Sequence, residues 1–156
     1  MASLAGVLIS VIGFGATLIN LAKTSSAAKR AELAATKTQK SIRLFDTVAD
    51  ASKAVSMLEE AKRLNRAKEW KVLLDRLSDI KKILVAINIE NSLLNDLQTR
   101  KIQSSVTQLA TMEHVLEKAI SESVDPDDPL QIARTISKQI EKVYAVLIEL
   151  KQERTH

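Results

Sequence analysis

The sequence predicts an all-α protein in which an N-terminal transmembrane helix is followed by an antiparallel four-helix bundle. All three glycines lie within the first 15 residues and both prolines lie near position 127, so residues 16–125 contain neither of the strongest helix breakers. Apolar residues make up 46% of the chain but aromatic residues only 3%, which indicates an aliphatic core. Apolar side chains also recur at alternating spacings of three and four, the period of amphipathic helices.

Residues 2–22 are uncharged and form the predicted transmembrane helix. As a helix, these 21 residues would span about 31 Å, close to the roughly 30 Å hydrocarbon core of a bilayer. Ten of them are Leu, Ile, Val or Phe, so insertion is favourable, although Gly, Ser, Thr and Asn20 offset part of the gain. The alternatives are a buried helix of a soluble protein and a cleaved signal peptide, which would need a positively charged n-region.

Small and polar residues form a stripe along one face of this segment, again at spacings of three and four. The pattern continues beyond the segment through Ala31, Ala34, Thr38 and Ser41. In a bilayer such residues let helices approach closely, so the stripe predicts a homo-oligomer; a narrow wet pore and a monomeric anchor are the alternatives. The helix-association stripe consists of Ser3, Gly6, Ser10, Gly13, Thr17 and Asn20.

Positive charge is concentrated directly after the apolar segment. Residues 23–45 carry a net charge of +5, whereas the rest of the chain has 17 basic and 18 acidic residues. By the positive-inside rule we expect a single-pass membrane protein with a cytoplasmic C-terminal domain, its basic residues facing the anionic lipid bilayer. No aromatic residue precedes Phe45 in this stretch, so nucleic acid is not an expected partner. The basic residues are Lys23, Lys29, Arg30, Lys37, Lys40 and Arg43.

The remaining chain is expected to form a basic helical segment over residues 23–41 and a helical bundle domain over residues 42–153. Whether the first helix runs unbroken from residue 3 to about residue 64 or breaks near Thr24 is open. Asn95 with Gln98 is a capping-box pattern, and Asp128 can cap a helix that begins at Pro129. The bundle helices are expected near residues 42–64, 67–88, 96–122 and 129–152.

Three apolar stripes mark the faces of the last three helices that are expected to be buried. One contains Trp70, Leu73, Leu77, Ile80, Leu84 and Ile87. The second contains Ile102, Val106, Leu109, Met112 and Leu116. The third contains Ala133, Ile136, Ile140, Val143, Leu147 and Leu150.

No residue pattern indicates catalysis, a cofactor or a metal site. Cysteine is absent, and the two histidines, His114 and His156, lie far apart outside any ligand-spaced cluster. There is no Gly-rich phosphate loop and no nucleophile–base set, so an enzyme and a small-molecule substrate are not expected. The acidic cluster Asp125, Asp127 and Asp128 is explained by turn and cap chemistry near a helix N-terminus.

Two resemblances bear on architecture. The stretches FDTVADASKAVSMLEEAKRLNRAKEWKVLLDRLSDIKKILVAI and NDLQTRKIQSSVTQL, with the final VLIELK, resemble a group of uncharacterised small bacterial proteins. That resemblance implies an N-terminal membrane helix, an all-helical cytosolic domain and a bacterial source, and it carries no catalytic motif. The layout of residues 3–22 before a bundle also resembles HeLo-type and mixed-lineage-kinase-like helical effector domains, by analogy only.

These observations favour a non-enzymatic, single-pass membrane protein whose cytosolic bundle acts as an oligomeric scaffold or as a docking module for a protein partner. A membrane-disrupting, pore-forming effector that acts in defence or lysis through oligomerised N-terminal helices is the first alternative. A soluble helical homo-oligomer is the second.

Overall fold

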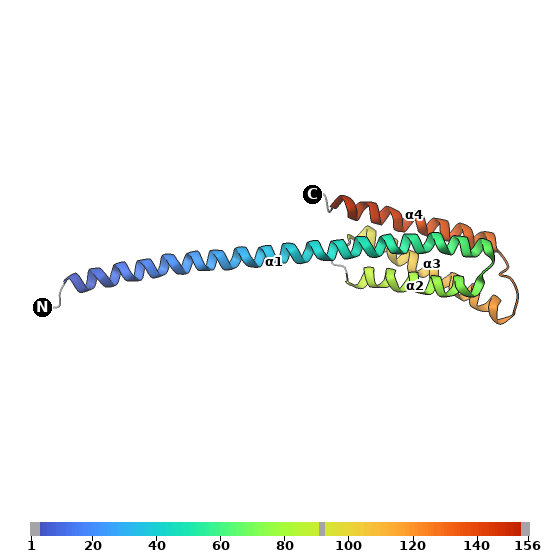
Figure 1. Ribbon diagram of the computed structural model, residues 1–156, viewed down its shortest axis with the longest axis horizontal. Coiled ribbons are helices and arrows are strands. Elements are labelled where there is room, and N and C mark those ends of the chain that lie inside the picture. The colour runs from blue at the N-terminus through green and yellow to red at the C-terminus, as the bar shows by residue number, and fades with distance from the viewer. Residues whose placement is uncertain (1–3, 91–92, 154–156) are drawn as a thin grey trace. The chain divides into compact units, whose positions relative to one another are not determined.

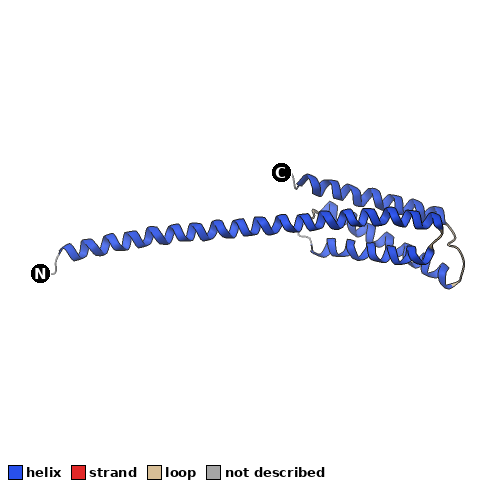
Figure 2. Ribbon diagram, viewed as in Figure 1, coloured by secondary structure: helices blue, strands red, loops and turns tan. Residues whose placement is uncertain are grey.

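The backbone of residues 4–90 and 93–153 and the side chains of residues 28–89 and 93–152 are described by the structure, a computed structural model. Helices joined by loops make up this part of the chain, and no strand occurs in it (Figure 2). The chain divides into two units, Met1–Ser41 and Ile42–His156. The helices are α1 (Leu4–Ala67), α2 (Trp70–Glu90), α3 (Asp96–Ser121) and α4 (Pro129–Glu153).

The prediction of a transmembrane helix followed by a separate four-helix bundle is wrong. The described chain forms four helices rather than five, because α1 continues without a break from Leu4 to Ala67. Thr24, Ser25 and Ser26 do not end it, since each costs only a few tenths of a kcal/mol relative to Ala in a helix and α1 contains no Gly or Pro after Gly15. In the part of the chain that the structure describes, no helix is both long and apolar enough to cross a bilayer.

The second unit is an up-and-down arrangement of four helical segments around one core. The C-terminal part of α1, α2, α3 and α4 run in alternating directions (Figure 1). The α1–α2 and α3–α4 connections therefore lie at one end of this unit, and the α2–α3 connection lies at the other. Short connections favour this antiparallel order, because consecutive helices then pack as neighbours.

The core is aliphatic and receives side chains from all four segments. The predicted stripes are largely confirmed, because most of their residues are buried. Trp70, Val106 and Ile140 are partly buried and pack against the core, and Ala133 is partly buried. From α1, the core receives Val48, Ala51, Ala54, Val55, Met57, Leu58 and Ala61. The three alanines let neighbouring helices approach closely, since they add no bulk between the helix backbones.

The predicted starts of α3 and α4 are confirmed. Asn95 forms a complete capping box with Gln98: the Asn95 side chain accepts from the Gln98 backbone N–H, and the Gln98 side chain accepts from the Asn95 N–H. Asp128 Oδ1 accepts a hydrogen bond from the Gln131 N–H at 2.7 Å, and α4 begins at Pro129. Both arrangements satisfy N–H groups that a helix leaves unpaired in its first turn.

The C-terminal ends of α1 and α3 use the same turn without glycine. Lys68 (φ 58°) and Ser123 (φ 56°) occupy the left-handed region, where glycine is usual. In each case the two N–H groups that follow the helix bond back to its last turn; for example, Glu69 N–H donates to Leu64 O at 3.1 Å and Val124 N–H to Ala119 O at 3.0 Å. These are Schellman motifs, and each holds a side chain where the backbone would favour glycine.

Polar contacts tie the helices of this unit together at several levels. Lys101 Nζ on α3 lies 2.7 Å from Glu149 Oε1 on α4, and Arg76 on α2 lies 3.1 Å from Glu60 on α1. Lys81 on α2 pairs with Glu113, which is largely buried on α3. The Lys101–Glu149 and Arg76–Glu60 pairs add little stability, because partly exposed ion pairs contribute little.

Candidate functional site

The basic segment, which we define as residues 28–41 of α1, is exposed on every side. All fourteen of its side chains are exposed. A helix usually gains most of its stability from one buried face. Among the side chains that the structure describes in the first unit, this segment has no such face. It carries four of the six basic residues predicted to face a membrane surface: Lys29, Arg30, Lys37 and Lys40. Arg43 is also exposed but belongs to the second unit, and the side chain of Lys23 lies outside the described residues.

The basic segment has two chemically different faces. Lys29, Leu33, Lys37 and Lys40 follow one another at spacings of four, four and three, so they share one side of the helix. Leu33 is 64% exposed in the middle of this row. The opposite side is uncharged, and it carries the continuation of the small-residue stripe through Ala31, Ala34 and Thr38.

The helix-association stripe itself is not tested. Ser3 lies outside the described residues, and the side chains of Gly6, Ser10, Gly13, Thr17 and Asn20 also lie outside them, although their backbone belongs to α1. The stripe therefore remains a prediction from spacing alone.

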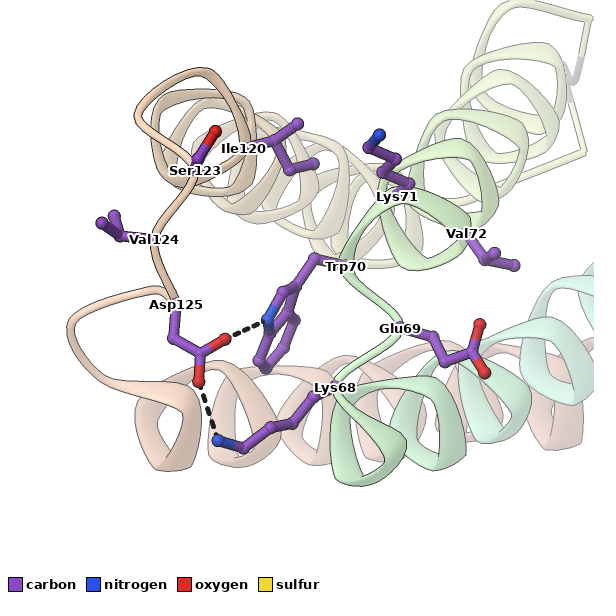
Figure 3. Close-up of a pocket in the computed structure, with 9 residues that line it drawn as sticks. All are labelled: Lys68, Glu69, Trp70, Lys71, Val72, Ile120, Ser123, Val124 and Asp125. Atoms are coloured by element: carbon purple, nitrogen blue, oxygen red, sulfur yellow. Dashed lines mark hydrogen bonds and ion pairs between the residues drawn. The ribbon is translucent and has the colours of Figure 1, made fainter.

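A second candidate lies in the bundle, where the α1–α2 turn meets the loop after α3. This hollow, here called the end hollow, has a volume of about 610 Å³. Residues 68–72 line one side, and Ile120 and residues 123–125 line the other (Figure 3). Its size falls within the range of roughly 300–1,000 Å³ that is typical of ligand pockets.

Asp125 joins the two sides of the end hollow. Its Oδ2 lies 2.7 Å from Lys68 Nζ, and its Oδ1 accepts a hydrogen bond from Trp70 Nε1 at 2.8 Å (Figure 3). Both carboxylate oxygens are therefore bonded to residues more than fifty positions earlier in the chain. The indole bond also holds the ring of Trp70, the only tryptophan of the chain, in a set orientation.

The same contacts make Asp125 a stronger acid. The hydrogen bond from Lys68, followed by the bond from Trp70, lowers the pKa of its carboxyl group. At Glu149, the bond from Lys101 and a weaker one from Gln98 likewise lower the pKa. A carboxyl whose pKa is lower in the folded state stabilises the fold above its unfolded pKa, and this contribution is lost as the pH falls through the folded pKa.

We therefore expect the stability of the chain to fall with acidification below about pH 4, the ordinary range of carboxyl pKa values. Urea unfolding midpoints at pH 6 and at pH 2–3 measure the loss. Asp125→Asn should reduce this pH dependence. Asp127→Asn removes the same charge two residues away but leaves the Lys68–Asp125 pair intact, so it should change the pH dependence less. An equal response of the two variants would contradict the assignment.

The end hollow was not predicted from the sequence. The sequence assigns Asp125 to turn chemistry together with Asp127 and Asp128, but Asp125 bonds to Lys68 and Trp70, and Asp128 alone caps α4. One signal was present. Because residues 16–125 contain no glycine, any helix that ends there with a left-handed residue has to use a residue other than glycine.

Within residues 28–89 and 93–152, no group of three or more His, Cys, Asp or Glu side chains could hold a metal ion. Comparison with protein-family models, curated proteins and solved structures gives no match. The two resemblances drawn from the sequence therefore stay predictions.

Proposed function

We propose that the protein is a non-enzymatic docking protein. Its helical bundle forms a stable folded domain, and its basic segment binds the surface of an anionic bilayer. The observation that carries this proposal is the exposed row Lys29, Leu33, Lys37 and Lys40. Lysines attract anionic headgroups at about 1 kcal/mol each near the surface. Leu33 supplies an apolar side chain that can enter the boundary between headgroups and acyl chains.

The charge balance of the segment supports the same partner. Its four basic residues face a single acid, Glu32, so it carries a net charge of +3. A second copy of the same row would be repelled, whereas a surface of anionic lipid is complementary. Self-association through the uncharged face would be compatible with lipid binding, because that face lies on the other side of the helix. The bundle would then be held at the membrane, where it can dock a protein partner.

The test is co-sedimentation of the full chain with vesicles of phosphatidylcholine, with and without phosphatidylserine. The double variant Lys37→Gln/Lys40→Gln should bind anionic vesicles about 30-fold more weakly, since two contacts of about 1 kcal/mol each are lost. Binding of the wild type should weaken as salt is raised.

The matched control is Lys53→Gln/Arg63→Gln, which removes the same charge from exposed positions of α1 within the bundle. It should bind nearly as the wild type does, and residues 2–22 are identical in all three proteins. Equal binding by both double variants, or wild-type binding that does not depend on phosphatidylserine, would refute the proposal.

A further inference from the structure

The end hollow is lined by both of the left-handed non-glycine residues of the described chain, Lys68 and Ser123. A non-glycine residue in this conformation is less stable than glycine, so each side chain is kept against a backbone preference. The ammonium group of Lys68 forms an ion pair with Asp125. Ser123 is exposed, and its hydroxyl makes no hydrogen bond to a described residue, so no contact within the described chain explains the serine.

A second polar side chain that lines the hollow also lacks a partner among the described residues. Lys71, exposed in the first turn of α2, forms no ion pair or hydrogen bond with any described residue. Lys71 lines the hollow together with Ile120, and Figure 3 shows the indole of Trp70 between the start of α2 and the Asp125 loop. The hollow thus combines one unpaired cation, one unpaired hydroxyl and an apolar wall.

The charges of the lining select the kind of ligand. Two lysines and two carboxylates, Glu69 and Asp125, cancel, and Lys68 is already paired. A doubly charged phosphate would therefore meet repulsion, while a single negative charge can pair with Lys71 and accept a hydrogen bond from Ser123. The half-buried ring of Trp70, with Ile120, offers an apolar surface to the rest of such a molecule.

From this arrangement we infer that the end hollow binds a carboxylate that carries an apolar chain. The carboxylate pairs with Lys71 and Ser123, and the apolar chain packs on Trp70 and Ile120. This site does not depend on the basic segment, so it stands or falls separately from lipid binding. Its chemistry fits either a free alkyl acid or the C-terminal residue of a peptide.

Trp70 reports binding directly, because its emission is the only tryptophan signal of the chain. The full-length protein is titrated with octanoate below its micelle concentration, with octylamine as the matched probe of opposite charge. Octanoate should change the emission in a saturable way, and octylamine should not. No saturable change with octanoate, or an equal change with octylamine, would overturn the inference.

Two variants test the named contacts. Lys71→Gln should weaken octanoate binding about tenfold, because a charge-assisted hydrogen bond is lost. The control Lys82→Gln, at an exposed lysine of the same helix, should bind as the wild type does.

Ser123→Gly should raise the melting temperature, since glycine suits the left-handed turn, and yet weaken binding severalfold. A more stable Ser123→Gly protein that binds as tightly as the wild type would remove Ser123 from the site, and undiminished binding by Lys71→Gln would overturn the inference.

The source of the carboxylate is settled by competition. A short peptide that ends in leucine is compared as the free acid and as the C-terminal amide. Displacement of octanoate by the acid but not by the amide, at a lower concentration than octanoate itself requires, identifies a chain terminus as the ligand. Tighter binding of octanoate identifies a free alkyl acid. Displacement by the amide as effective as by the acid would show that the carboxylate is not recognised, and would overturn the inference.

Discussion

Leu109→Ala should lower the free energy of unfolding by about 2–5 kcal/mol, a large fraction of the stability of a domain of this size. Leu109 lies on the buried face of α3 and has no exposed surface. The substitution removes three carbon atoms, Cγ and the two methyl groups, from the buried core and leaves a cavity that neighbouring helices can fill only in part. Leu77→Ala, at an equally buried position of α2, should have a similar effect.

Leu97→Ala is the control, because it makes the same chemical change on the same helix at a side chain that is 60% exposed. It should cost less than about 1 kcal/mol, since little apolar surface is buried there. Urea denaturation followed by circular dichroism measures all three variants. If Leu109→Ala were no more destabilising than Leu97→Ala, the assigned core face of α3 would be wrong.

Lys81→Met should also be strongly destabilising, by about 2–3 kcal/mol at neutral pH. The side chain of Glu113 is only 10% exposed, and Lys81 is its ion-pair partner. Removing Lys81 leaves a carboxylate that is largely buried and has lost its compensating charge. The expected loss is smaller than for a fully buried pair, because Lys81 itself is 32% exposed and water can reach the vacated side.

Lys82→Met is the matched control at the next position, where the lysine is 72% exposed and pairs only with Asp79 on its own helix. It should change stability by less than about 0.5 kcal/mol. The double variant Lys81→Met/Glu113→Leu should recover most of the loss, since no buried charge then remains without a partner. Failure of this rescue, or equal losses for the two lysines, would mean that the pair is not what stabilises this position.

Much of the fold could be predicted because the governing interactions are local. The spacing of apolar residues identified the buried faces of α2, α3 and α4, and the observed ends of these helices lie within three residues of those predicted. Asn95 with Gln98 and Asp128 before Pro129 were recognisable because a cap joins residues only three positions apart.

The extent of the first helix was harder to predict, because no Gly or Pro near Thr24 marks a break in it. Thr24, Ser25 and Ser26 favour a turn only weakly, and the choice between a break and a continuous helix rests on small differences in propensity. The structure continues α1 through this point.

The two candidate sites also differ in how far the sequence could predict them. The basic residues of α1 were visible in the sequence because charge and helical spacing are local properties, and the structure adds that Leu33 is exposed among them. The end hollow could not be found in this way. Asp125 is separated from Lys68 by 57 positions, and only the packing of α2 and α3 in opposite directions brings the two turns together.

The sequence by itself determined that the chain is helical, which faces of the last three helices are apolar and where its positive charge lies, because each of these depends on residues within about one or two helical turns. Only the tertiary structure decided which polar residues enter the core, such as Ser105 and Gln139, and which charges meet across helices. Those outcomes depend on how far each helix is displaced and rotated against its neighbours. That geometry is set by the packing of the whole core and leaves no periodic signal in the chain.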